Sequence, residues 1–301
     1  MEIAITGSSG LIGTALAAAL RDDGHGVRPV VRGPSPDPAA VRWDPAAGTI
    51  DAAGLEGVDA VVHLAGVGIG DKRWNDAHKA AVRESRTAGT GLLARTLAGL
   101  DRPPAVLVSG SAVGYYGDRG DEVLTELSAP GDDFLAGVVQ AWEAAAHPAA
   151  EAGIRTVLLR TGIVLAAGGG ALPRLALPFK VFLGGRLGSG RQWMSWVHLD
   201  DEVGAIRFAI DTPALTGPVN AVAPEPVTNA ELARALGAAL HRPAAVPVPA
   251  FGPRLLMGRE MADELVFASQ RVRPQVLTDA GYPFAHTDVR AALRAIYGGD
   301  R

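Results

Sequence analysis

Three glycines near the start of the chain have the spacing of a phosphate-binding turn. Gly7, Gly10 and Gly13 follow the apolar run 2–6 and lead into an Ala/Leu-rich stretch. The first glycine would permit a tight turn, the second would let the backbone approach a pyrophosphate, and the third would let a helix pack on a strand. The N-terminus of that helix would offer free N–H groups and a partial positive charge. A plain tight turn is the alternative. The predicted contacts to a bound dinucleotide are Gly7, Ser8, Ser9, Gly10, Leu11, Ile12 and Gly13.

The end of the second predicted strand, at 27–31, indicates which dinucleotide would bind. An Asp or Glu there would hydrogen-bond the adenosine ribose and select NAD. This strand is followed by Arg32 and Gly33 and carries no acid. Arg32 could pair bidentately with a 2′-phosphate, and the serines of the glycine turn could add hydroxyl donors. The sequence therefore favours NADP(H), with a solvated strand-end arginine as the alternative.

Short apolar runs alternate with longer amphipathic stretches, which predicts β–α–β units and a parallel sheet. Strands are predicted at 2–6, 27–31, 59–64, 105–109 and 155–160, and helices at 11–21, 75–100, 133–152, 200–210 and 229–240. Glycine-rich loops surround the apolar segment 172–183, an extended connector follows at 243–253, and two helical segments are predicted near 255–269 and 288–297. We expect an α/β fold, a Rossmann-type doubly wound parallel sheet with a smaller C-terminal substrate-side lobe. The NADP-binding domain would cover 1–165, with a return at about 195–225, and the lobe would cover 166–301, including a small C-terminal domain at about 248–298.

Composition argues against several classes of function. The 301 residues carry a net charge of −4, which gives no electrostatic reason to expect nucleic acid or an anionic membrane as a partner. The absence of cysteine excludes disulfides, thiolate metal sites and a cysteine nucleophile. The seven histidines are scattered without an HExxH pattern, so no metal is expected. The chain opens on a predicted core strand and has no apolar stretch of membrane-spanning length, which predicts a cytoplasmic protein.

Several segments resemble the extended short-chain dehydrogenase/reductase family, in its epimerase/dehydratase branch. They are TGSSGLIG at 6–13, DAVVHLAG at 59–66 and SGSAVGYYG at 109–117. A subfamily labelled sugar-nucleotide epimerase is more similar, through VRWDPAAG at 41–48, ESR at 84–86, RTGIVLAAGGGAL at 160–172 and GRQWMSWVHLDDEV at 190–203. The segment 265–284 resembles that subfamily's small C-terminal domain of unknown function. The resemblance implies a nicotinamide cofactor, with further contacts at Leu64, Ala65 and Gly66.

The catalytic pattern of that family is incomplete in this chain. The family uses a serine and a YxxxK pair, in which the lysine lowers the pKa of the tyrosine that transfers the proton. Ser111 matches the serine, but none of the four tyrosines has a lysine four residues on. Tyr115 or Tyr116 could act as the acid/base instead, with Arg119 as a cationic neighbour. Alternatively, Lys72 or Arg73 could reach the nicotinamide pocket.

The predicted substrate side also departs from the family. Related epimerases hold a diphosphate with an arginine four residues before the histidine matching His198, where this chain has Met194. Lys72, Arg191 and Trp193 are the tentative substrate residues. We expect Asp200 and Asp201 to cap the helix that follows them, and His63 to line the adenine-ribose side without doing chemistry.

These observations predict an NADP-dependent oxidoreductase or epimerase acting on a small hydroxyl or carbonyl substrate, such as a sugar derivative. The absent YxxxK pair keeps open a non-catalytic NADP(H)-binding sensor or regulatory protein on the same fold. The resemblance further implies a homodimer.

Overall fold

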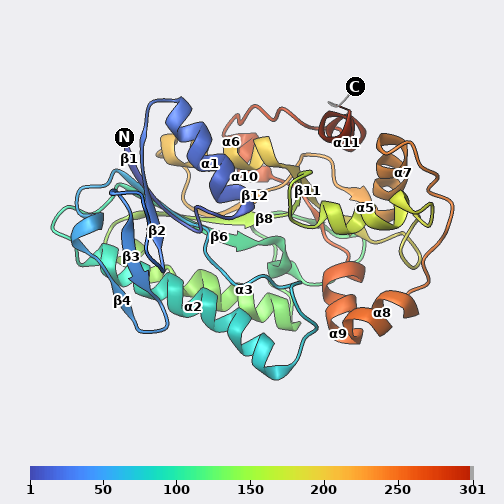
Figure 1. Ribbon diagram of the computed structural model, residues 1–301, viewed down its shortest axis with the longest axis horizontal. Coiled ribbons are helices and arrows are strands. Elements are labelled where there is room, and N and C mark those ends of the chain that lie inside the picture. Colours follow the sequence, from blue (N-terminus) through green and yellow to red (C-terminus); the bar gives the residue numbers. More distant parts are fainter. Residues whose placement is uncertain (299–301) are drawn as a thin grey trace. The chain divides into compact units, whose positions relative to one another are not determined.

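The computed structural model describes residues 1–298, which divide into two compact units (Figure 1). The first unit comprises residues 1–112, 138–160 and 203–219. The second comprises residues 113–137, 161–202 and the described residues from 220 onward. No helix within residues 1–298 is both long and apolar enough to cross a membrane.

The first unit is built on an eight-stranded sheet. Its order is β12 (Gly217–Ala221), β8 (Arg155–Thr161), β6 (Val106–Ala112), β5 (Ala60–His63), β1 (Glu2–Thr6), β2 (Gly26–Val31), β3 (Val41–Asp44) and β4 (Thr49–Ile50). β1 pairs in parallel with both β2 and β5, and only β4 is recorded as antiparallel to its neighbour. Strand order therefore reverses between β1 and β5, where open α/β sheets bind ligands at the carboxyl ends of the strands.

Helices cover both faces of this sheet. α1 (Leu11–Asp22) and α6 (Leu199–Asp211) lie on one face, and α2 (Asp76–Ala98) and α3 (Phe134–Ala145) lie on the other (Figure 1). The apolar stripe of α2 packs into a core cluster with sheet residues; the cluster includes Ala4, Val61, Leu93, Ala94, Leu97 and Leu107. The α2 members recur at helical spacing, so burial fixes which face of the helix meets the sheet. The central strands β1, β5 and β6 are buried on both faces, as expected for a sheet covered by helices on each side. The α/β class and the doubly wound parallel sheet are confirmed.

Two details of the predicted elements change. The helix expected over 133–152 is two helices, because α3 ends at Ala145 and α4 (His147–Glu151) begins with Pro148 in its first turn. Proline lacks the N–H that an uninterrupted helix would need there, and its ring crowds the carbonyl four residues earlier. The strands β3, β4 and β12 were not predicted. β4 has only two residues, and β12 begins with a Gly-Pro dipeptide, which normally marks a turn.

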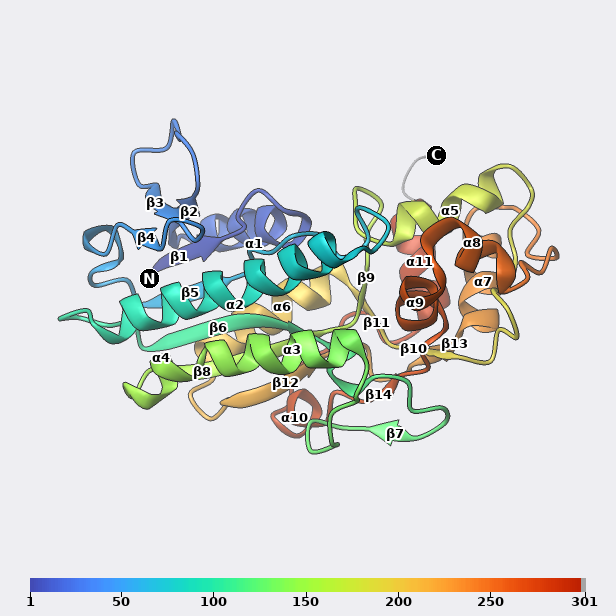
Figure 2. The same ribbon diagram turned by 90° about the horizontal axis from the view of Figure 1, so that it is seen from below.

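The second unit has three two-stranded pairs and short helices (Figure 2). The strand pairs are β10 (Trp193–Met194) with β13 (Val227–Thr228), β11 (Trp196–His198) with β9 (Ile163–Leu165), and β14 (Arg271–Val272) with β7 (Val123–Leu124). The helices are α5 (Leu172–Lys180), α7 (Asn229–Ala239), α8 (Phe251–Met257), α9 (Arg259–Ala262), α10 (Gln275–Asp279) and α11 (Val289–Tyr297). Trp196 is fully buried at the centre of its core.

Candidate functional site

The glycine turn joins the end of β1 to the start of α1. Gly7 has a φ of +68°, and a Cβ there would lie 2.8 Å from the backbone carbon of Leu64. A Cβ on Gly13 would collide with the carbonyl oxygen of Gly7. A Cβ on Gly10 would meet the same oxygen at 3.2 Å, a milder contact. Gly7 therefore needs its left-handed backbone, and Gly13 lets α1 approach the turn closely.

The N-terminus of α1 is suited to an anion. Its N-cap residue, Gly10, makes no side-chain capping hydrogen bond, and the first turn of the helix contains no acidic residue. The N–H groups of the first turn are therefore left to a ligand or to water, and the helix dipole adds positive potential. These residues fit the pyrophosphate of a dinucleotide.

A buried network holds the neighbouring β5 loop against β1. His63 Nδ1 lies 2.7 Å from Thr6 Oγ1, and its Nε2 lies 2.9 Å from Thr90 Oγ1. The N–H groups of Leu64 and Ala65 donate to the same threonine oxygen, Thr6 Oγ1, at 3.1 and 3.2 Å. Burial lowers the pKa of His63 to about 4, so the imidazole is neutral at neutral pH. In this network His63 positions Leu64 and Ala65, two of the predicted cofactor contacts.

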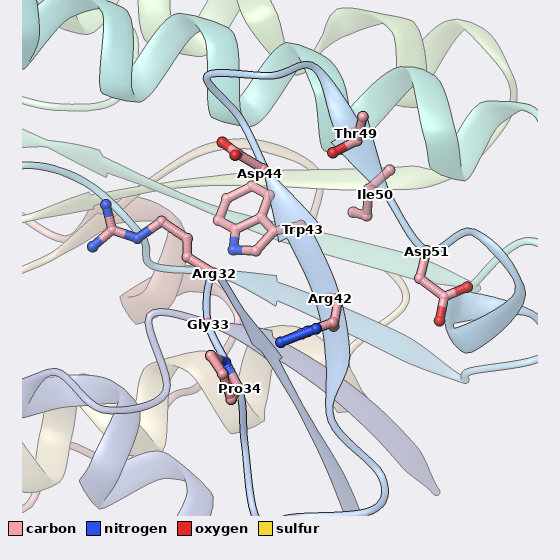
Figure 3. Close-up of a pocket in the computed structure, with 9 residues that line it drawn as sticks. All are labelled: Arg32, Gly33, Pro34, Arg42, Trp43, Asp44, Thr49, Ile50 and Asp51. Atoms are coloured by element: carbon pink, nitrogen blue, oxygen red, sulfur yellow. The ribbon is translucent and has the colours of Figure 1, made fainter.

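Arg32 lines a surface hollow of about 380 Å³ at the ends of β2 and β3 (Figure 3). Arg42, on β3, lines the same hollow and had not been singled out in the sequence. No ion pair is recorded for either arginine within residues 1–298. The acids of the hollow accept local backbone N–H groups: Asp44 from Ala46 and Ala47, and Asp51 from Gly54. The hollow thus offers two guanidinium groups to an anionic ligand.

Ser111, at the end of β6, belongs to a buried polar network. Its hydroxyl donates to Glu143 Oε1 at 2.6 Å. Arg160 donates to both oxygens of the same carboxylate, through Nε at 2.8 Å and Nη2 at 2.9 Å. All three side chains are buried. The hydroxyl proton of Ser111 is therefore donated to Glu143, and the hydroxyl oxygen of Ser111 can still accept a hydrogen bond.

Sequence reasoning missed Glu143 and Arg160 as partners of Ser111. They follow Ser111 by 32 and 49 residues, and no local spacing links them. Helix α3 carries Glu143 on the segment where the family's tyrosine and lysine would stand. In the family comparison, Phe134 and Leu135 stand near the tyrosine position and Val138 and Val139 near the lysine position. All four are apolar, and all but Phe134 are buried. The helix therefore supplies a carboxylate and no phenol or amine to this part of the first unit.

The two candidate tyrosines belong to the second unit and differ in burial. Tyr116 is fully buried, and its hydroxyl donates to Asn220 Oδ1 at 2.8 Å. Tyr115 is partly exposed and packs edge to face on Tyr116, with ring centroids 5.3 Å apart. The guanidinium of Arg119 donates to both carboxylate oxygens of Glu122, at 2.8 and 2.9 Å. Of the two phenols, only Tyr115 is within reach of solvent.

Arg86 is a buried cation beside the β5 loop. Its Nη1 donates to the carbonyls of Val67 and Val82 at 3.0 and 3.2 Å. Its Nε has no partner among the described residues, and its guanidinium carbon lies 5.0 Å from the ring centroid of Trp142. Burial lowers the pKa of Arg86 to about 10, so it remains charged at neutral pH. The sequence marked Arg86 only as part of the ESR resemblance.

The three tentative substrate residues have different surroundings. Lys72, in the first unit, and Arg191, in the second, are exposed. Trp193 donates from Nε1 to Asp121 Oδ1 at 2.8 Å, and the guanidinium carbon of Arg271 lies 4.3 Å from its ring centroid. Trp193 is thus held by partners within the second unit.

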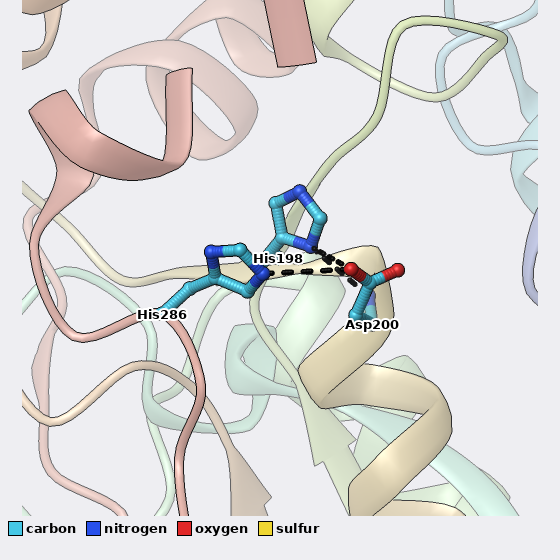
Figure 4. A group of neighbouring side chains, drawn as sticks. All are labelled: His198, Asp200 and His286. Atoms are coloured by element: carbon cyan, nitrogen blue, oxygen red, sulfur yellow. Dashed lines mark hydrogen bonds and ion pairs between the residues drawn. The ribbon is translucent and has the colours of Figure 1, made fainter. Parts of the chain in front are cut away.

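A group of His198, Asp200 and His286 lies where β11 meets α6 (Figure 4). Nδ1 of His198 and Nε2 of His286 are each 3.4 Å from Asp200 Oδ2. The two rings stack, with centroids 3.7 Å and planes 28° apart. Lone pairs in nearly parallel planes do not converge on one point, and His198 Nδ1 already accepts the N–H of Asp200. This geometry fits a hydrogen-bonded group better than a cage for a metal ion.

The sheet is parallel and reverses its order at β1, and a glycine turn leads into the open N-terminus of α1. These two features define a Rossmann-type dinucleotide-binding protein. Within that class, the chain belongs to the NAD dependent epimerase/dehydratase family, whose profile matches residues 3–222. Residues 248–296 match a domain of unknown function, DUF1731. The resemblance read from the motifs is confirmed.

Relatives and solved structures share nearly the full length of the chain. An epimerase family protein of Mycobacterium bovis is 46% identical over 291 residues, which cover 97% of this chain and 96% of the relative. A crystal structure of the human epimerase family protein SDR39U1 with NADPH has a TM-score of 0.91 and 37% identity, covering 99% of this chain and all of that one. A nucleoside-diphosphate sugar epimerase from Corynebacterium glutamicum has a TM-score of 0.83 and 41% identity, covering 99% of this chain and 58% of that one.

Proposed function

We propose that the protein is an NADP(H)-dependent oxidoreductase or epimerase acting on a hydroxyl or carbonyl group of a small molecule, such as a sugar derivative. The observation that carries the cofactor assignment is the hollow at the end of β2, which Arg32 and Arg42 line with two guanidinium groups. The end of β2 itself lacks the acid of an NAD-type ribose contact. The NADPH bound to the human relative supports the same choice.

Ser111 takes part in this proposal as a hydrogen-bond acceptor. Its proton is held by Glu143, and the same carboxylate pairs with the guanidinium of Arg160. A substrate hydroxyl could then donate to the oxygen of Ser111 and be oriented by it. The nicotinamide would supply or accept the hydride. Tyr115, four residues after Ser111 in the chain, is the proposed acid/base because it is the partly exposed one of the two tyrosines.

The cofactor is tested by fluorescence titration with NADPH and, separately, NADH, using energy transfer from the five tryptophans. We expect a preference for NADPH of about tenfold or more, equivalent to about 1.4 kcal/mol. Preference for NADH would overturn the role of Arg32. Turnover is then sought with carbonyl and alcohol compounds by following NADPH absorbance, and Ser111→Ala should abolish any activity found.

A second candidate is a non-catalytic NADP(H)-binding sensor or regulatory protein. It is favoured by the apolar residues compared with the family's proton-transfer pair, since none of them can transfer a proton: Phe134, Leu135, Val138 and Val139. A turnover lost in Tyr115→Phe while NADPH affinity is kept would exclude it. We further propose a cytoplasmic homodimer, on family resemblance, which sedimentation of the intact chain would test.

A further inference from the structure

Exposed apolar side chains are concentrated on one part of the second unit. Eleven large hydrophobic side chains are exposed among the described residues, and three of these, Met1, Val123 and Leu127, lie elsewhere. The other eight, with exposures from 41% to 81%, lie in two chain segments, 177–183 at the end of α5 and 246–256 leading into α8. We call them the apolar surface: Leu177, Val181, Phe182, Leu183, Val246, Phe251, Leu255 and Leu256. Concentrated exposure of this kind marks an interaction site more often than scattered apolar residues do.

Backbone contacts join the two segments that form this surface. The N–H of Val246 donates to Gly184 O at 3.1 Å, and the N–H of Val248 donates to Arg186 O at 2.9 Å. The chain then enters α8 at Phe251. The end of α5 and the connector before α8 therefore form one continuous feature within the second unit.

Phe182 is exposed and has a backbone conformation that residues with a side chain rarely adopt. Its φ is +62°, in the region that glycine normally occupies after a helix. The N–H of Phe182 donates to Phe179 O, and that of Leu183 donates to Pro178 O, which closes the end of α5. The phenylalanine ring is 58% exposed and so gains little from burial. The guanidinium carbon of Arg242 lies 4.7 Å from the centroid of this ring, so a cation stands beside the exposed aromatic side chain.

The two chain segments that form the apolar surface contain no acidic residue, although the whole chain is acidic. No Asp or Glu occurs between Glu151 and Asp200 or between Glu231 and Glu260. Asp263 pairs with Arg254 at 2.7 Å and with Arg259 at 3.6 Å. Three further cations of this region form no ion pair with any of residues 1–298. These are Lys180, Arg186 and Arg242.

We propose that the apolar surface binds the headgroup region of an anionic lipid membrane as a peripheral contact. Apolar side chains among uncompensated cations are the pattern of an interfacial membrane site. Each Lys or Arg near an anionic bilayer adds attraction that salt weakens. The expectation of no anionic membrane partner rested on the net charge of the whole chain, which averages this basic region with the acidic remainder. The proposal is independent of the cofactor and of catalysis.

The test is co-sedimentation of the full chain with vesicles of phosphatidylcholine containing about 30% phosphatidylglycerol, compared with phosphatidylcholine alone. We expect binding to the anionic vesicles to be at least about tenfold stronger and to fall as salt is raised. The variants Leu255→Ser/Leu256→Ser and Lys180→Glu/Arg242→Glu should each reduce binding about tenfold or more. The control, Leu127→Ser, removes an apolar residue that is 96% exposed elsewhere and should bind as wild type does.

Circular dichroism verifies that each variant is folded. If a double variant unfolds, Phe182→Gly replaces it, because glycine suits the positive φ while the aromatic ring is removed. The proposal is overturned if wild type does not sediment with anionic vesicles, if it binds neutral vesicles equally, or if folded variants bind unchanged. Concentration-dependent association in light scattering that is lost in Leu255→Ser/Leu256→Ser, without vesicle binding, would assign the surface to a second copy of the chain.

Discussion

Ser111 donates its hydroxyl proton to Glu143 across 2.6 Å, from the end of β6 to α3. Glu143 also pairs with both nitrogens of the Arg160 fork, so one carboxylate orients a serine and neutralises a buried guanidinium. The family's serine is thereby fixed as an acceptor, although the tyrosine and lysine that normally accompany it are absent. The same carboxylate thus stabilises the first unit, by pairing with Arg160, and orients Ser111 for the proposed reaction.

Removing Glu143 should destabilise the protein strongly. Glu143→Ala would deprive the buried Arg160 of its carboxylate, and we expect a loss of about 3–5 kcal/mol in the free energy of unfolding. The urea midpoint measures this. The double variant Glu143→Met/Arg160→Met should recover much of the loss, since it removes both charges. A double variant no more stable than Glu143→Ala would contradict a charge-pairing role.

His63 should make stability depend on pH. Its folded-state pKa of about 4 lies below the ordinary 6.5, so the unfolded chain binds the proton more readily. The contribution is fully present above about pH 6.5 and is lost as pH falls toward 4, by up to about 3 kcal/mol. Urea unfolding at several pH values measures it. His63→Asn should flatten this part of the profile, and an unchanged profile would show that other groups control it.

Gly13 should tolerate no side chain. The Cβ of Gly13→Ala would collide with the carbonyl oxygen of Gly7, which should cost about 1–3 kcal/mol of stability and weaken NADPH binding. Thermal unfolding and the tryptophan titration measure the two effects. Gly168→Ala is the matched control, since nothing lies within 4 Å of its Cβ. Equal behaviour of the two variants would mean that the turn relaxes around the added methyl group.

Arg42 should contribute to the choice of dinucleotide together with Arg32. Replacing either by Ala should weaken NADPH binding about tenfold while NADH affinity changes less than about twofold, because only NADPH carries the 2′-phosphate. Arg102→Ala, at an exposed arginine outside the hollow, serves as the control. An Arg42→Ala variant that weakens both dinucleotides equally would place Arg42 outside phosphate recognition.

The adjacent Asp200 and Asp201 should respond differently to replacement. Asp201 is buried and accepts the N–H groups of Ala285 and His286, both at 2.8 Å. Asp201→Ala should therefore lose about 2–3 kcal/mol by leaving these donors unpaired. Asp200 is 72% exposed, and Asp200→Ala should change stability by less than about 1 kcal/mol. Chemical denaturation compares them. Because α6 begins at Leu199, both residues lie inside the helix and neither is the cap expected from the sequence. Similar losses would contradict the difference in their contacts as the cause.

The sequence by itself determined the features that depend on neighbouring residues. Gly7 and Gly13 follow directly from the stereochemistry of a strand–turn–helix, and the missing YxxxK is a plain count of tyrosines and lysines. The strands 2–6 and 155–160 were predicted within a residue or two, because apolar runs bounded by turns carry their own signal. The family resemblance was likewise readable from contiguous motifs.

Only the tertiary structure decided which distant residues meet. Thr6, His63 and Thr90 are joined across β1, β5 and α2, and Ser111 meets Glu143 because α3 packs against β6. Asp201, expected to cap its own helix, instead binds a loop more than 80 residues later. Local periodicity fixes which face of an element is buried, but the partner of a buried polar group depends on how elements pack. Because an unpaired polar group is costly to bury, packing and hydrogen bonding select such partners together.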